Sequence, residues 1–85
     1  MKPIKVNFKK DGKATSTTIN QNIAFVYGLE KGLKMENMDT YYKEVKELLN
    51  NFVLNLVERG FNSLDKDFIE RELIFAIRFR NGETK

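Results

Sequence analysis

The chain of 85 residues contains no cysteine and no histidine. Their absence excludes disulfide frameworks, zinc sites built on sulfur or nitrogen ligands, and mechanisms that need a histidine base or a thiolate. Only carboxylates, Lys, Tyr, Ser and Thr are left for catalysis, and no recognisable pattern pairs them. We therefore expect a protein that is not an enzyme and that binds no cofactor or metal.

Long apolar runs are missing too. No stretch reaches the length of a membrane span, and the lysine-bearing start lacks the apolar segment of a signal peptide. We expect a cytoplasmic protein without a membrane partner. It should form one domain over residues 1–85, with a basic strand or hairpin region at 1–19, a helical region at 20–80 and a polar tail at 81–85.

The positive charge is unevenly distributed. Residues 1–20 carry five lysines and one aspartate, a net charge of +4, whereas the whole chain carries +3. A basic segment concentrated in this way is typical of phosphate binding. Lysines that keep an exposed strand soluble and guard its edge would produce the same pattern.

The basic segment has the periodicity of β-structure. Apolar and polar residues alternate through IKVNFKK, which indicates a strand with one buried face. Asp11-Gly12 is a turn signal, because both residues tolerate positive φ. The β-branched stretch KATSTTI reads as a second extended segment. The two segments predict a hairpin, although the first could instead be a mobile arm.

Helical patterns fill the rest of the chain and predict an α+β fold that is mostly helical, with helices at about 20–33, 39–59 and 63–80. Asn20 is the expected N-cap of the first helix, and Asp39 or Thr40 that of the second. Gly60 should end the second helix in the left-handed conformation.

Two features of these helices have more than one reading. The first helix contains Gly28 and Gly32 at the spacing of a close-approach motif, but we favour a C-cap role for them. Residues 73–79 are short and apolar enough to be a strand, although we prefer a helix because DKDFIERE continues smoothly into them.

The second half of the central helix is apolar on nearly every side. One short helix and a small strand layer would struggle to cover such a surface in a chain of this size. The third helix or a second copy must do so, and we predict an intertwined homodimer. Its predicted core consists of Leu49, Phe52, Val53, Leu56 and Val57.

The segment TSTTINQNIAFVYGLEKG resembles the ribbon-helix-helix family of dimeric DNA-binding proteins, with a partial resemblance that covers about residues 13–59. Ile19 matches the last core residue of the family's strand, Asn20 the start of its first helix, and Ile23 the first core position of that helix. In this family one strand from each chain pairs into a ribbon that enters the major groove.

The resemblance implies roles for particular residues. Ser16 and Thr18 would face the bases, while Thr15 and Thr17 would face inward. The amide groups near Asp39 and Thr40, at the start of the second helix, would anchor a phosphate.

A different strand could instead be the one that contacts DNA. If IKVNFKK were the ribbon, it would present Lys5, Asn7 and Lys9 outward, and these side chains suit phosphates and base edges better than hydroxyls do. Lys10 and Lys13 complete the predicted basic set. An ordinary solvated hairpin face would show the same alternation.

These observations predict a small dimeric DNA-binding protein, a transcriptional regulator that uses its basic N-terminal β element. The alternative is a non-enzymatic protein-interaction module that uses its apolar helical surface, such as an adaptor or inhibitor encoded by a mobile element.

Overall fold

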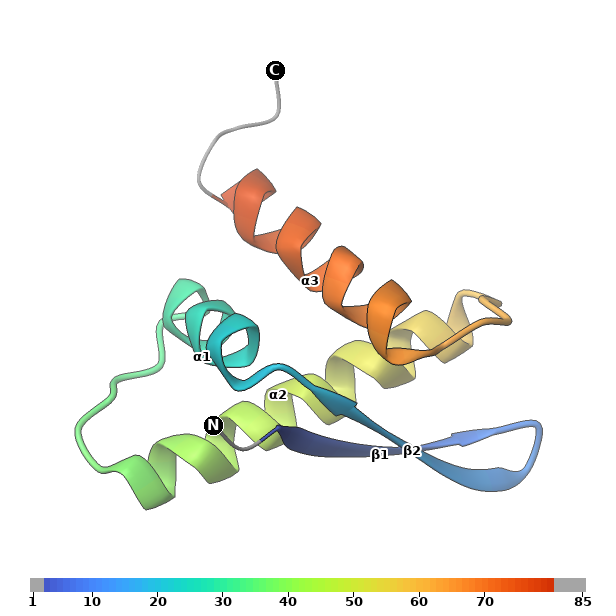
Figure 1. Cartoon of the computed structure of the whole chain (residues 1–85), viewed down its shortest axis with the longest axis horizontal. Coiled ribbons are helices and arrows are strands. Elements are labelled where there is room, and N and C mark those ends of the chain that lie inside the picture. The colour runs from blue at the N-terminus through green and yellow to red at the C-terminus, as the bar shows by residue number, and fades with distance from the viewer. Residues whose placement is uncertain (1–2, 81–85) are drawn as a thin grey trace.

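The computed structural model describes residues 3–80, except the side chains of residues 79 and 80. The chain forms an N-terminal hairpin of β1 (Ile4–Lys10) and β2 (Lys13–Ile19), followed by α1 (Gln21–Glu30), α2 (Met38–Glu58) and α3 (Lys66–Arg80). The predicted α+β fold is confirmed, and residues 73–79 are helical. Figure 1 shows the hairpin lying along α2. Helix α1 packs against α2, and α3 packs against α1 and β2. The predicted tail, residues 81–85, lies outside the described residues.

The hairpin forms because its sequence alternates and its turn residues accept positive φ. Asp11 has a φ of 53° and Gly12 a φ of 80°, which suits a two-residue turn between antiparallel strands. The strands pair from Ile4 opposite Ile19 to Lys10 opposite Lys13. The first segment is therefore a strand rather than an arm.

Side chains cap all three helices. The Asn20 Oδ1 atom accepts from the amide of Asn22 at 2.8 Å, as predicted for α1. The Asp65 Oδ1 atom accepts from the amide of Phe68 at 2.9 Å at the start of α3. For α2 the predicted cap is wrong. The helix begins earlier than expected, and its N-cap is Asn37, whose Oδ1 atom accepts from the Thr40 amide at 3.1 Å.

The two glycines of α1 have different roles. Gly32 follows the helix with a φ of 90°, which fits the predicted C-cap role. Gly28 lies inside the helix, and its environment shows a close approach rather than a cap. A Cβ atom there would lie 2.7 Å from Tyr41 Oη and 2.8 Å from Val45 Cγ2, so α1 meets α2 at this point without room for a methyl group.

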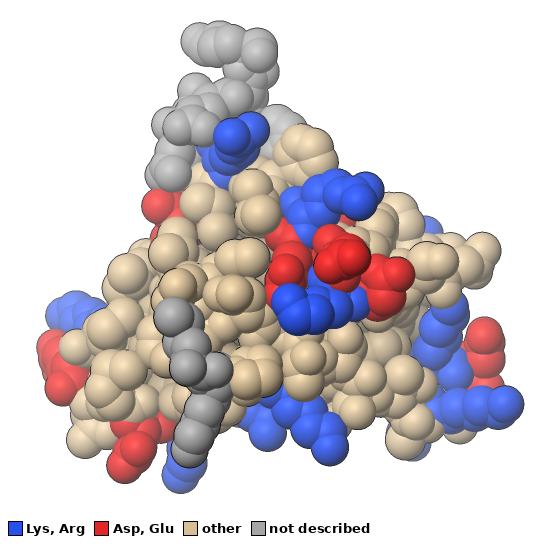
Figure 2. Space-filling view, in the orientation of Figure 1, with Lys and Arg blue, Asp and Glu red and all other residues tan. Residues whose placement is uncertain are grey.

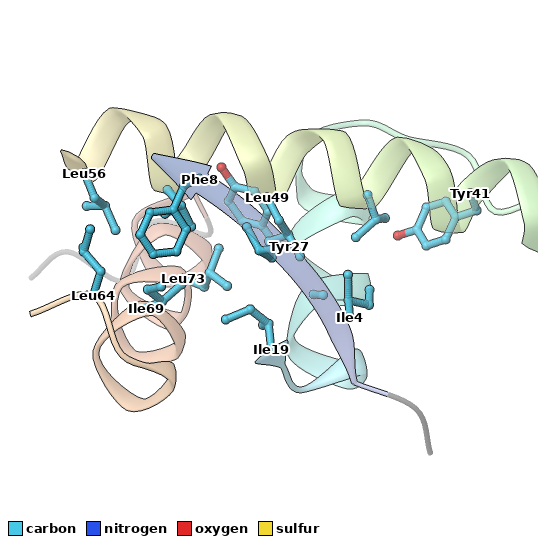
Figure 3. Packing of buried hydrophobic residues seen from close by; sticks show 14 residues of the cluster. Ile4, Phe8, Ile19, Tyr27, Tyr41, Leu49, Leu56, Leu64, Ile69 and Leu73 are labelled. Carbon is cyan, nitrogen blue, oxygen red and sulfur yellow. The ribbon is translucent and has the colours of Figure 1, made fainter. Parts of the chain in front are cut away.

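The core lies between the hairpin and the three helices. Figure 3 shows Phe8 from β1, Leu56 from α2 and Leu73 from α3 converging on it. The alternating apolar residues of β1 are buried, and Ile4 and Val6 have no exposed surface. One sheet face is thus covered by helices, which leaves the other face to solvent.

The second half of α2 is covered within a single chain. Leu49 and Val53 are 0% exposed and Leu56 is 1% exposed, while Phe52 and Val57 are partly buried against the same core. Strand β1 and helix α1 pack against α2 and supply the cover. This removes the reason for assigning these five residues to a dimer core. Dimerisation stays a prediction, but it needs a different surface.

Candidate nucleic-acid interface

The outer face of the hairpin carries polar side chains from both strands. Cross-strand pairing places Lys5 opposite Thr18, Asn7 opposite Ser16 and Lys9 opposite Ala14. All six residues are exposed. The sequence offered the β1 residues and the β2 residues as alternative DNA-facing sets, and the pairing brings both sets onto one surface. We call these six residues the outer hairpin face.

Thr15 and Thr17 lie on the opposite side of β2, where the resemblance expected inward-facing residues. They pair with Phe8 and Val6, which are part of the core. Thr17 is partly buried, whereas Thr15 is exposed because it lies close to the turn. The inner face is therefore well covered at the helical end of the hairpin and less so near its tip.

Helix α2 fixes the hairpin in place. The Asn50 Oδ1 atom accepts from the backbone amide of Asn7 at 3.2 Å. This amide points away from β2, so the bond satisfies a donor on the outer edge of β1. The bond and the buried residues of β1 hold the outer hairpin face on a helical support. Asn50 was not predicted, because its partner lies 43 residues away in the sequence.

Two of the predicted lysines lie outside this face. Lys10 and Lys13 pair next to the turn, on the inward side of the strands. The Nζ atom of Lys10 donates to the Asn62 carbonyl in the loop before α3, so Lys10 ties the tip of the hairpin to the helices. Lys13 is exposed and adds positive charge beside the turn.

Positive charge dominates this end of the molecule. Lys5 and Lys9 are the charged members of the outer hairpin face, and Asp11 in the turn is the one acid of residues 1–20. Figure 2 shows Lys and Arg side chains at the right and lower edges of the view, where the hairpin lies. Lys5 and Lys9 lie about 13 Å apart along β1, beyond the Debye length of about 8 Å at physiological salt, so each lysine attracts an anion largely independently of the other.

The surface is a platform rather than a pocket. A shallow hollow of about 430 Å³ lies over its distal half, lined by Asn7, Phe8, Lys9, Ala14, Thr15 and Ser16. It combines hydrogen-bonding groups with a basic side chain, while the ring of Phe8 belongs to the core on the other side of the sheet. Such a hollow suits an extended, polar, anionic ligand better than a small molecule that needs enclosure.

The predicted phosphate anchor is separate from the tip of the hairpin. Asp39 and Thr40 are exposed in the first turn of α2, but the Thr40 amide already donates to Asn37. Figure 1 shows this end of α2 at the far side of the molecule from the hairpin turn. A ligand centred on the hairpin tip would therefore not be held by this helix N-terminus.

Residues 3–80 contain no cluster of three carboxylates that could hold a metal ion. Burial raises the pKa of Tyr27 and of Tyr41, and both tyrosines belong to the core. Among these residues no helix is long and apolar enough to cross a membrane.

Comparison of the chain with family models, curated proteins and solved structures finds no match. The ribbon-helix-helix resemblance accordingly stays a prediction. In that family the strand pairs with the strand of a second chain, whereas here β2 pairs along one edge with β1 of the same chain.

Proposed function

We propose that this chain is a small, non-enzymatic DNA-binding protein that acts in the cytoplasm as a homodimeric transcriptional regulator. The outer hairpin face is the proposed contact with duplex DNA. The observation that carries the proposal is the convergence of Lys5, Asn7 and Lys9 with the hydroxyls of Ser16 and Thr18 on one exposed face.

The dimensions of the hairpin suit a DNA groove. Lys5 and Lys9 are four strand residues apart, which corresponds to about 13 Å at about 3.3 Å per residue. The major groove of B-DNA is about 12 Å wide and admits a two-stranded β-ribbon. The two lysines would reach phosphates on either side of the groove, while Asn7 between them would meet base edges, where the asparagine amide pairs well with adenine.

The rigid support favours this mode of binding. The amide of Asn7 is fixed by Asn50 and the inner face of β1 is buried, so little conformational freedom is lost on binding. Sequence-independent affinity would come from the lysines, and base preference from Asn7 with Ser16.

Fluorescence anisotropy on a random duplex at low salt tests the proposal. The wild-type chain should bind at micromolar concentration, with affinity that falls as salt increases because counterions are released. The variant K5Q/K9Q should bind more weakly and show a shallower salt slope, by about 0.9 for each lost phosphate contact.

A matched control separates local contacts from net charge. The variant K34Q/K43Q removes two exposed lysines far from the hairpin in sequence and changes the net charge equally. It should keep the wild-type salt slope. The proposal fails if the wild-type chain does not bind, if binding ignores salt, or if the two double variants lose affinity equally.

The second candidate is a protein-interaction module. The apolar half of α2 no longer supports it, because only Leu54 of the large apolar residues there is substantially exposed, at 45%. The support now comes from α3, where Ile74 is 43% and Phe75 is 48% exposed. Such side chains on one helix mark a candidate contact surface.

A further inference from the structure

The two edges of the hairpin differ in how their backbone groups are used. The two-residue turn makes Lys10 and Lys13 a hydrogen-bonded pair, and such pairs then alternate along the antiparallel ladder. Every second residue of each strand therefore directs its backbone N–H and C=O away from the other strand. On β1 this is seen at Asn7, whose outward amide donates to Asn50 of α2.

The corresponding outward groups of β2 belong to Ala14, Ser16 and Thr18. All three residues are exposed, and in the described part of the chain no hydrogen-bond partner meets their outward amides and carbonyls. Strand β2 runs from the hairpin turn to α1 (Figure 1), and α3 meets the chain just beyond it, where Glu70 accepts from the Asn20 amide. The edge of β2 is therefore open from Ala14 to Thr18.

The sequence of β2 does little to block this edge. Proteins usually protect an exposed strand edge with proline, a bulge or several charged side chains. The segment KATSTTI contains no proline, its pairing with β1 is continuous, and Lys13 is its one charged residue. Threonine also favours the extended conformation. The edge can thus accept a further strand, a common mode of peptide recognition.

The charge around the edge selects the kind of strand. Residues 1–20 carry a net charge of +4, with Asp11 as their one acid. Lys13 is exposed on the edge strand itself, and Lys9 lies opposite Ala14 on β1. Because Ala14 is short, a carboxylate on an added strand can meet Lys9 across it, over two strand spacings of about 10 Å in total. A second copy of this basic hairpin would instead bring like charges together.

We propose that the open edge of β2 binds an extended, acidic segment of a partner protein as a third strand of the sheet. The segment pairs antiparallel to β2, the arrangement with the more stable ladder, and exchanges backbone hydrogen bonds with Ala14, Ser16 and Thr18. Its carboxylates lie near Lys9 and Lys13. The backbone groups of this edge take no part in the proposed contact with DNA.

Amide hydrogen exchange of the full, isotope-labelled chain tests the proposal by NMR. The probe is a short synthetic peptide of alternating glutamate and threonine. At saturation it should slow exchange at the amides of Ala14, Ser16 and Thr18 by at least about tenfold, because each amide gains an acceptor. The Asn7 amide already has an acceptor and should exchange as before.

Two matched peptides separate the backbone ladder from charge. The same peptide with every backbone amide methylated keeps all its carboxylates but has no backbone donor, and it should bind at least about tenfold more weakly. A peptide of alternating lysine and threonine keeps the donors but reverses the charge, and it should not bind.

Variants of the protein test the same two features. S16P removes the central outward amide, and proline is tolerated at an edge position whose N–H faces away from the sheet. It should weaken binding of the acidic peptide by at least about tenfold. K9Q/K13Q should also weaken binding, whereas the matched control K34Q/K43Q should bind as the wild type does. Circular dichroism checks the fold of each variant, and the methylated peptide decides the role of the ladder if S16P does not fold.

Three results would overturn the assignment. The first is that the acidic peptide does not bind, and the second is that its methylated form binds equally well. The third is protection of the three amides in the free chain that rises with protein concentration, because the occupant would then be a second copy. DNA binding is measured separately, so a chain that binds DNA but not the acidic peptide rejects only the assignment of the β2 edge.

Discussion

Replacing Gly28 by alanine should destabilise the protein, although local propensity predicts the opposite. In the interior of a helix, alanine is more favourable than glycine by about 1 kcal/mol. Judged from the sequence alone, G28A would therefore strengthen α1. The surroundings of Gly28 instead make the substitution destabilising.

The added methyl group has nowhere to go. It would lie 2.7 Å from Tyr41 Oη and 2.8 Å from Val45 Cγ2, well inside ordinary contact distance. Neither neighbour moves freely, because the Tyr41 hydroxyl donates to the Phe25 carbonyl at 2.5 Å and Val45 is 0% exposed. Helix α1 must then shift away from α2, or the tyrosine must give up its hydrogen bond.

The opposing terms can be compared. Overpacking of this kind costs about 1–3 kcal/mol, and losing the Tyr41 hydrogen bond costs about 1 kcal/mol more. The gain in helix propensity offsets about 1 kcal/mol of this cost. We expect a net loss of about 1–3 kcal/mol in the free energy of unfolding, a sizeable part of the total for a domain of this length.

Urea denaturation followed by circular dichroism measures this loss. A double-mutant cycle with V45A isolates the contact, since that background removes one of the two clashing atoms. G28A should cost less in the V45A background than in the wild type. If G28A raises the unfolding free energy, or costs the same in both backgrounds, the packing of α1 on α2 is not as described.

Two further predictions concern α2 and the buried tyrosines. N37A should lower the unfolding free energy by about 1 kcal/mol, because it removes the acceptor for the Thr40 amide. D39A should have a smaller effect. Equal losses for the two variants in urea denaturation would contradict the observed cap. Burial raises the pKa of Tyr27 and Tyr41 above the ordinary 10.0, so the folded state holds these protons more tightly than the unfolded state. Their contribution to stability should be complete below pH about 10 and should decline as the pH rises from there through the folded pKa. Unfolding measured between pH about 8 and about 11 should show this decline, and the decline should be less steep in Y27F.

The sequence alone determined the elements and most of their ends. The alternation in IKVNFKK, the Asp11-Gly12 turn, the capping role of Asn20 and the left-handed Gly60, whose φ is 88°, all depend on neighbouring residues. Such local preferences can be read directly, and they predicted a hairpin followed by three helices. They were misleading at α2, where Asn37, Asp39 and Thr40 are all good caps and the boundary depends on which of them the helix uses.

Only the tertiary structure decided how these elements cover one another. Hairpin pairing brought Lys5 and Thr18 to one face, although the sequence had offered them as alternatives. The same packing buried Leu56 within a single chain and closed α1 on α2 at Gly28. Burial, cross-strand pairing and close approach depend on residues far apart in the chain, as between Asn7 and Asn50, and local periodicity carries no information about them.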